Sequence, residues 1–203
     1  ICDMDGMKPI AAQSTLPTYN QSDHWPLANE KVRFVGECIA MCVAPTRAEA
    51  EDLAEAVIVD LEPLPVHVSI ETALAPGAEK LHDEWADNLC LTTEFDNDLT
   101  EARKNATVTI ERNYSTARQC MNPMEGKGTL AYWDGKAEQL VFYTSTQVPH
   151  LIRTGVAECL GLDQGDVRVI APDVGGGFGY KCVLQPEELT VGWAAKHLGR
   201  PIR

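Results

Sequence analysis

Seven short stretches of the chain are apolar or alternate between apolar and polar residues, and each predicts a strand. They are residues 32–36, 39–44, 58–62, 107–111, 129–133, 140–144 and 167–170. β-Branched and aromatic residues in such short runs are typical of strands. Asp134-Gly135 separates the fifth stretch from the sixth and predicts a hairpin turn there.

Apolar residues spaced three and four apart predict helices between these strands. Thr46 and Glu49 have the spacing of a capping box, which places the start of one helix at Arg47. The predicted buried face of that helix consists of Ala50, Leu53, Ala54 and Val57. Further helical segments are predicted at residues 70–74, 99–104, 148–160 and 186–198. The third of these should end at Gly161, with an inward face made of Leu151, Ile152, Val156, Cys159 and Leu160.

The order of these elements predicts an α+β protein with two domains. A strand, a helix and a strand make a compact α/β unit within residues 1–80, although residues 1 to 30 fit neither period and should be irregular. Residues 81–105 are polar and are interpreted as a connector, and residues 106–203 form the second domain.

Composition narrows the class of protein. Of 203 residues, 44% are hydrophobic and 23% are charged, as in globular proteins. A formal net charge of −13 argues against a nucleic-acid partner, because phosphates would be repelled. There is no apolar run long enough to span a bilayer. Seven cysteines without paired spacing favour reduced thiols and a cytoplasmic location. The chain starts at Ile1 and both ends read as interruptions, so we expect a fragment or one piece of a split polypeptide.

A glycine-rich run follows the last predicted strand and precedes the last helix. It contains Gly175, Gly176, Gly177, Phe178 and Gly179. A strand, a glycine turn and a helix can cradle an anion or a cofactor. A phosphate-binding P-loop is excluded because Tyr180 precedes Lys181 and Cys182 follows it. Tyr180 also breaks the spacing of a dinucleotide fingerprint. An ordinary tight turn is the alternative, but Phe178 has little local packing and favours a face presented to a ligand.

Two polar residues elsewhere, Gln147 and Glu125, are candidates for chemistry. Gln147 ends a strand and opens a helix, where ligands tend to bind, although it could also be a turn or capping residue. Glu125 is a candidate whose alternatives are a surface carboxylate and a salt-bridge partner. Glu187 and Glu188 begin the last helix, where they favour the dipole, and we interpret them as structural.

In this order, residues 144–147, 167–169 and 173–181 resemble the molybdenum hydroxylases. These are the large subunits of xanthine dehydrogenase, aldehyde oxidase and carbon monoxide dehydrogenase. Residues 35–37, 47–56 and 61–66 resemble that family's α/β hammerhead domain. The segment from Arg118 to Glu125 resembles the start of its molybdopterin-binding domain, and residues 199–203 resemble the stretch that follows its helix. The resemblance implies a hammerhead domain in residues 1–80 and the first part of a molybdopterin-binding domain in residues 106–203.

The resemblance also implies roles for single residues. Gln147 aligns with a glutamine that hydrogen-bonds an oxo ligand of molybdenum. Gly176, Gly177, Phe178 and Gly179 align with a loop whose backbone holds the pterin, and Gly175 opens that loop. Phe178 would also lie near the substrate, so Gln147 and Phe178 are the predicted catalytic residues. No protein side chain is expected to bind the metal, because the pterin's dithiolene sulfurs do so.

The implied reaction is hydroxylation of an aldehyde, an N-heterocycle or a similar small substrate, with water as the oxygen source. The cofactor would be molybdenum-molybdopterin, in its plain or its cytosine dinucleotide form. Iron–sulfur clusters and FAD on partner domains or subunits would take the electrons. Cys182 stands where xanthine and aldehyde oxidases often carry a glutamate, which argues against a purine substrate, and Gly126 replaces a usual proline.

The family's catalytic glutamate belongs to a later segment than the one that matches here. The remainder of the large subunit or a second chain would therefore complete the site. The alternative is a non-catalytic module of the same fold, which serves cofactor insertion or subunit docking.

Overall fold

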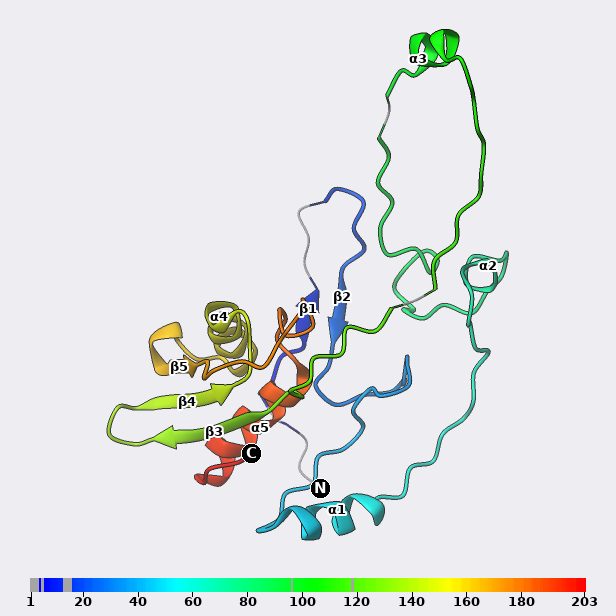
Figure 1. The fold of residues 1–203 in the computed structure, drawn as a ribbon. Helices are drawn as coiled ribbons and strands as arrows, with labels where there is room; N and C mark the ends of the chain where they lie inside the picture. Colours follow the sequence, from blue (N-terminus) through cyan, green and yellow to red (C-terminus); the bar gives the residue numbers. More distant parts are fainter. Residues whose placement is uncertain (1–3, 5, 13–15, 96, 118) are drawn as a thin grey trace.

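The computed structural model describes residues 4, 6–12, 16–95, 97–117 and 119–203, so Arg118 lies outside the described residues. Its best-packed part is a three-stranded sheet in the order β3-β4-β5 (Figure 1). Strand β3 (Thr129–Asp134) pairs antiparallel with β4 (Gln139–Thr144), and β4 pairs parallel with β5 (Val167–Ile170). All three strands were predicted from their pattern.

The hairpin between β3 and β4 forms because of its turn chemistry. The Asp134 carboxylate accepts hydrogen bonds from the backbone N–H groups of Lys136 (2.9 Å) and Ala137 (3.2 Å). An aspartate that bonds the backbone two and three residues on closes such a turn. The register then places Thr129 opposite Thr144, so that β4 ends directly before the segment that carries Gln147.

The two predicted helices are present and pack against this sheet: α4 (Pro149–Leu160) on β5, and α5 (Pro186–Leu198) mainly on β3. Each begins with proline in its first turn and ends at a glycine in the left-handed conformation, at φ 64° for Gly161 and 60° for Gly199. The core between helices and sheet is Ala131, Leu140, Phe142, Ile152, Val156, Ala157, Val167 and Ala195.

The predicted inward face of α4 is largely confirmed. Ile152, Val156 and Cys159 are buried, and Leu160 is half-buried against the core. Leu151 is 61% exposed, so that part of the prediction is wrong. Its position is one residue, or about 100° around the helix, from Ile152, and it therefore turns away from the sheet.

The first residues form a small hairpin that sequence reasoning missed. Strand β1 (Ile10–Ala12) pairs antiparallel with β2 (Ser22–His24). The segment just before β1 packs on the C-terminal lobe, which consists of β3, β4, β5, α4 and α5. There Met7 forms an apolar cluster with Cys159 and Leu189. Three-residue strands as polar as Ser22–His24 are too short to show a period.

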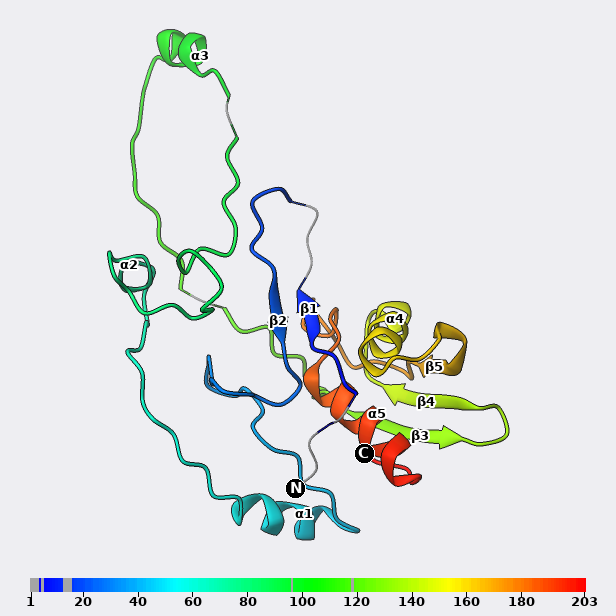
Figure 2. The ribbon, with the colours of Figure 1, turned by 180° about the vertical axis from the view of Figure 1, so that it is seen from behind.

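The remainder of the chain reaches away from this lobe (Figures 1 and 2). It carries α1 (Arg47–Glu55), α2 (Ile70–Ala73) and α3 (Thr100–Asn105), all close to their predicted places. The capping box of α1 is confirmed: Thr46 Oγ1 accepts from Glu49 N (3.3 Å) and Glu49 Oε2 accepts from Thr46 N (3.1 Å).

Two predictions for this part are wrong. The predicted inner face of α1 is not buried, and Leu53 is 50% exposed. Residues 32–36, 39–44, 58–62 and 107–111 form no strands. A strand needs a neighbouring backbone for its hydrogen bonds, and these described segments pair with no other strand, so no sheet covers α1 either. Within the described ranges, no helix has the length and apolar character needed to cross a membrane.

Candidate functional site

The glycine-rich run forms a tight loop between β5 and α5. Its backbone enters the left-handed region at Gly176 (φ 93°), Phe178 (φ 50°) and Gly179 (φ 88°). Phe178 is the unusual member, because a bulky non-glycine residue rarely adopts this conformation. The residue is 68% exposed, so the strained backbone presents an aromatic side chain to the surroundings.

The loop leaves backbone donors available. Gly175 N–H and Gly179 N–H donate to side chains, and Tyr180 N–H donates to Gly177 O (2.8 Å). Within the part of the chain that the structure describes, the N–H groups of residues 176, 177 and 178 have no acceptor. Successive free N–H groups in such a turn create a local positive potential that suits an anion or an acceptor-rich ring.

Gln147 lies against this loop. Its side-chain Oε1 accepts a hydrogen bond from Gly179 N–H (3.1 Å), and its own N–H donates to Lys181 O (3.0 Å). Because the bond to Gly179 uses the amide oxygen, the amide Nε2 keeps both of its hydrogens for another partner. No described residue accepts from Nε2. The structure thus brings together two residues that are 32 positions apart in the sequence.

Three glycines of the loop are required by close contacts. A Cβ at Gly177 would overlap the side-chain Oε1 and Cδ of Gln147, and one at Gly175 would lie 2.7 Å from the Cβ of Glu125. At Gly176 a Cβ would lie 3.0 Å from the Phe178 ring, besides the strain of its φ. Glycine therefore permits the loop to touch Gln147 and Glu125 directly.

Glu125 is the salt-bridge partner of Lys181. The Lys181 side chain is fully buried, and its Nζ lies 2.8 Å from Glu125 Oε2. The same oxygen accepts from Gly175 N–H at 2.6 Å. The hydrogen bond from Lys181, followed by that from Gly175, lowers the pKa of the Glu125 carboxyl. Of the two alternatives left by the sequence, the salt-bridge partner is thus confirmed.

Lys181 is the residue that sequence reasoning missed. The lysine two residues after the glycine run was used only to exclude a P-loop. The signal that could have found it is its place between this run and a helix with apolar residues, because an ammonium buried there needs a carboxylate partner. No local pattern points to Glu125, which lies 56 residues earlier.

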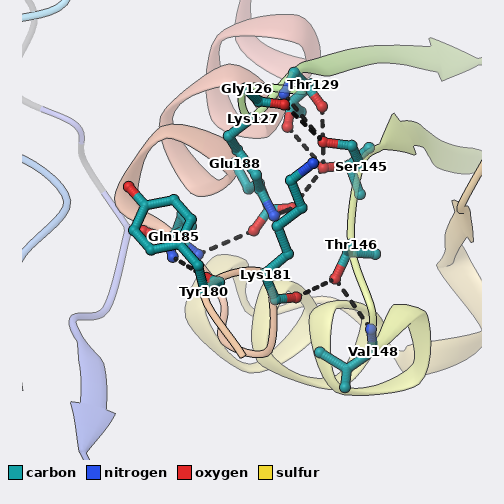
Figure 3. A network of polar contacts seen from close by, with 12 residues as sticks. Gly126, Lys127, Thr129, Ser145, Thr146, Val148, Tyr180, Lys181, Gln185 and Glu188 are labelled. Atoms are coloured by element: carbon teal, nitrogen blue, oxygen red, sulfur yellow. Dashed lines mark hydrogen bonds and ion pairs between the residues drawn. The ribbon is translucent and has the colours of Figure 1, made fainter. Parts of the chain in front are cut away.

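A second buried charge cluster links β4 and the segment before β3 to α5 (Figure 3). Glu188 is fully buried; its Oε1 accepts from Thr144 Oγ1 (2.5 Å) and pairs with Lys127 Nζ (2.9 Å). Its Oε2 accepts from Gln185 N–H (2.9 Å) and caps α5. Glu188 thereby joins the end of β4 to the start of α5, which agrees with the structural role predicted for it.

The segment between β4 and α4 is joined to the end of the loop by the side chain of Thr146. Thr146 Oγ1 donates to Lys181 O (3.1 Å) and accepts from Val148 N–H (3.2 Å), as Figure 3 shows. Thr146 is buried, so this link is shielded from water. Hydrogen bonds of the two neighbouring residues, Thr146 and Val148, therefore hold Gln147 in position.

A cavity of about 570 Å³ lies nearby but does not contain the predicted site residues. It is lined by Lys127, Gly128, Thr129, Leu130, Tyr143, Tyr180, Gln185, Glu187, Val191 and Arg203. Tyr180 is its one link to the glycine-rich loop. The predicted site is instead an open surface formed by the loop and Gln147.

The donor set fits an acceptor-rich, anionic cofactor. Three loop N–H groups and the Gln147 NH₂ group are free to donate among the described residues, and the nearest carboxylate is neutralised by Lys181. A pterin with ring oxygens and nitrogens, sulfurs and a phosphate carries many acceptors. The residues present therefore fit such a group. At position 177 only glycine fits, because any side chain there would overlap Gln147.

Comparison with known proteins agrees with this fit. The family described as molybdopterin cofactor-binding domain matches residues 81–203. The aldehyde oxidase and xanthine dehydrogenase a/b hammerhead domain matches residues 4–65. The chain therefore belongs to the molybdenum hydroxylase large-subunit family, and its fold is of the α+β class with these two domains.

Individual relatives support the same assignment. The chain is 35% identical to the nicotine 6-hydroxylase large subunit of Paenarthrobacter nicotinovorans over 87% of its length, which is 22% of that protein. It is 32% identical to the carbon monoxide dehydrogenase large chain of Hydrogenophaga pseudoflava over 98% of its length and 26% of that protein. Among solved structures, quinoline 2-oxidoreductase from Pseudomonas putida 86 matches with a TM-score of 0.90 and 36% identity, over 98% of this chain and 25% of that one. The chain thus spans about a quarter of the length of these relatives.

Proposed function

We propose that this chain is part of the molybdopterin-binding large subunit of a molybdenum hydroxylase. The enzyme would oxidise an aldehyde, an N-heterocycle or a similar small substrate, with water as the oxygen source. The observation that carries the proposal is the hydrogen bond from Gly179 N–H to Gln147 Oε1, which joins the amide and the loop at one surface.

Each predicted residue has a task in this proposal. The free N–H groups of residues 176 to 178 would hold the pterin, with Gly175, Gly177 and Gly179 keeping the loop close enough to do so. The Nε2 hydrogens of Gln147 would donate to an acceptor ligand of the metal. Phe178 would border the substrate with its exposed ring. When bound, the molybdenum cofactor supplies the two-electron oxidation of the substrate carbon.

The names of the relatives support this range of substrates. Two of them act on nicotine and quinoline, which contain nitrogen heterocycles, and one acts on carbon monoxide. We further propose the plain or the cytosine dinucleotide form of the cofactor, and partner subunits with iron–sulfur clusters and FAD. A cytoplasmic location is proposed as well, because the six cysteines among the described residues are free thiols.

The test is metal analysis and turnover of the complete complex purified from its native source. We expect close to one molybdenum per large subunit and reduction of an artificial electron acceptor with at least one aldehyde or N-heterocycle from a panel. Absence of molybdenum in a folded complex would refute the proposal. Stoichiometric molybdenum without turnover of any panel substrate would favour the alternative of a non-catalytic module.

A further inference from the structure

Lys181 connects the three segments that make up the site. Its buried Nζ holds Glu125 Oε2 (2.8 Å), and its backbone oxygen accepts from Gln147 N–H (3.0 Å) and from Thr146 Oγ1 (3.1 Å). The side chain thus reaches the segment before β3, while the carbonyl holds the segment after β4. No side chain of this site other than Lys181 is fully buried.

Glu125 extends this connection to the other end of the loop. Its Oε2 accepts from Gly175 N–H (2.6 Å), and its backbone N–H donates to Gly175 O (3.4 Å). Gly175 begins the loop and Lys181 ends it, so the ion pair joins the two ends. The spacing between the ends fixes where the free N–H groups of residues 176 to 178 point.

The charge of Lys181 has a second consequence. The Glu125 carboxylate is 39% exposed and lies against the loop whose donors are free. Without the ammonium, this negative charge would repel an anionic cofactor from the neighbouring free N–H groups. With Lys181 paired to it, the carboxylate orders the loop and leaves its potential positive.

We propose that Lys181, with Glu125 as its partner, is a positioning residue of the cofactor site. It sets the loop donors and the Gln147 backbone in one arrangement without touching the cofactor itself. The inference rests on the proposed function, which assigns a molybdenum cofactor to this surface.

The chain contains a matched control for a purely structural ion pair. Lys127 and Glu188 form a pair of similar length, 2.9 Å, in which the carboxylate is fully buried and the lysine is 14% exposed. That pair joins the segment just before β3 to α5, and neither of its side chains contacts the loop residues 175 to 179. Lys127→Met should therefore lower stability without altering the loop.

The experiment uses four variants of the complete enzyme: Lys181→Met, Glu125→Met, the double variant of these two, and Lys127→Met. Removing one partner leaves an unpaired charge, whereas removing both with apolar residues is often neutral for stability. The double variant is thus expected to keep a thermal midpoint close to that of the wild type. Its molybdenum content should nevertheless fall at least about fivefold, and kcat per bound molybdenum should fall while KM stays within about twofold. Lys127→Met should keep its molybdenum content despite a lower midpoint.

Amide hydrogen exchange tests the positioning role independently of the proposed function, because it measures the order of the loop and not the metal content. Peptides that contain Gln147 and Gly175 should exchange faster in the double variant than in the wild type and in Lys127→Met, whether or not metal is bound. A double variant with wild-type exchange in these peptides, or with wild-type molybdenum content, would overturn the positioning role. A wild-type enzyme without molybdenum but with the predicted exchange pattern would refute the proposed function and keep the positioning of the loop.

Discussion

The side-chain oxygen of Gln147 accepts a hydrogen bond from the backbone N–H of Gly179, at 3.1 Å. This contact determines which end of the amide is free. The oxygen is occupied by the loop, so the NH₂ group is the part that can meet a ligand. The site is consequently a set of donors, which is the chemistry that an acceptor-rich cofactor requires.

Substitutions at Gln147 can distinguish the contribution of its oxygen, which contacts the loop, from that of its NH₂ group, which would contact a ligand. Gln147→Glu keeps an oxygen that can accept from Gly179 N–H but loses the NH₂ donor. In the complete enzyme we expect its thermal midpoint to stay near that of the wild type, while turnover falls by at least about tenfold, because the loss of one preorganised donor costs on the order of 100-fold. Gln147→Ala loses both contacts and should show a similar loss of turnover with little change in folding. Full turnover in Gln147→Glu would rule out the donor role.

Gly177→Ala should displace either the loop or Gln147. Its Cβ would overlap the Gln147 side chain, and overpacking of this kind costs about 1–3 kcal/mol. We expect lower molybdenum content and lower turnover in the complete enzyme. Gly135→Ala is the matched control, because a Cβ there meets no atom within 4 Å and the residue lies in the β3–β4 turn. Equal molybdenum content in the two variants would contradict the close contact.

The pH dependence of stability should report the Glu125 ion pair. Lys181 and Gly175 N–H lower the pKa of Glu125 in the folded chain, so its carboxylate stabilises the fold above its ordinary pKa of about 4.3. That contribution is lost as the pH falls through the lowered folded value. Between pH 5 and 7 we expect thermal midpoints of wild type and Glu125→Gln to differ by a constant amount. Below about pH 4 the two curves should converge, and parallel curves down to pH 2 would be inconsistent with the assignment.

Cysteine reactivity should follow burial. Burial raises the pKa of the Cys159 thiol to about 11, and its Sγ donates to Pro9 O (3.5 Å). Cys90 and Cys120 are exposed. Because the thiolate is the nucleophile, alkylation by a maleimide at pH 8 should label the two exposed cysteines within minutes and spare Cys159 until the chain is unfolded. Mass spectrometry of the labelled peptides reads out the order, and early labelling of Cys159 would contradict the packing of Met7 against it.

Loss of the Thr46 cap should loosen α1 alone. Thr46→Ala removes the side-chain acceptor of the capping box, which typically costs about 1 kcal/mol. Since α1 buries no residue, amide exchange in residues 47–55 should quicken by about fivefold while exchange in α4 stays unchanged. A matching change in α4 would indicate that α1 is coupled to the core.

The sheet and its two helices could be predicted because their signals are local. Strands β3, β4 and β5 show their period, and α4 and α5 carry proline at the start and glycine at the end. The meeting of Gln147 with the loop follows from topology. Strands β4 and β5 are parallel neighbours, with Tyr143 opposite Ile170, so the segments that follow them leave the sheet at the same edge.

The remainder depends on contacts that no local pattern contains. Residues 58–62 have the composition of a strand but form none, because a strand also needs a partner. The Lys181–Glu125 pair joins residues 56 apart, and its oxygen–nitrogen contact is set by the folded arrangement of three segments. The roles of Gln147, Phe178 and the loop glycines in cofactor binding stay predictions.

The most direct test of the central claim is anomalous diffraction at the molybdenum absorption edge, from crystals of the complete enzyme. We expect a single strong peak beside the loop of residues 176–178, with the Nε2 atom of Gln147 directed at the metal's ligands. A molybdenum peak elsewhere in the large subunit, distant from both Gln147 and Phe178, would contradict it.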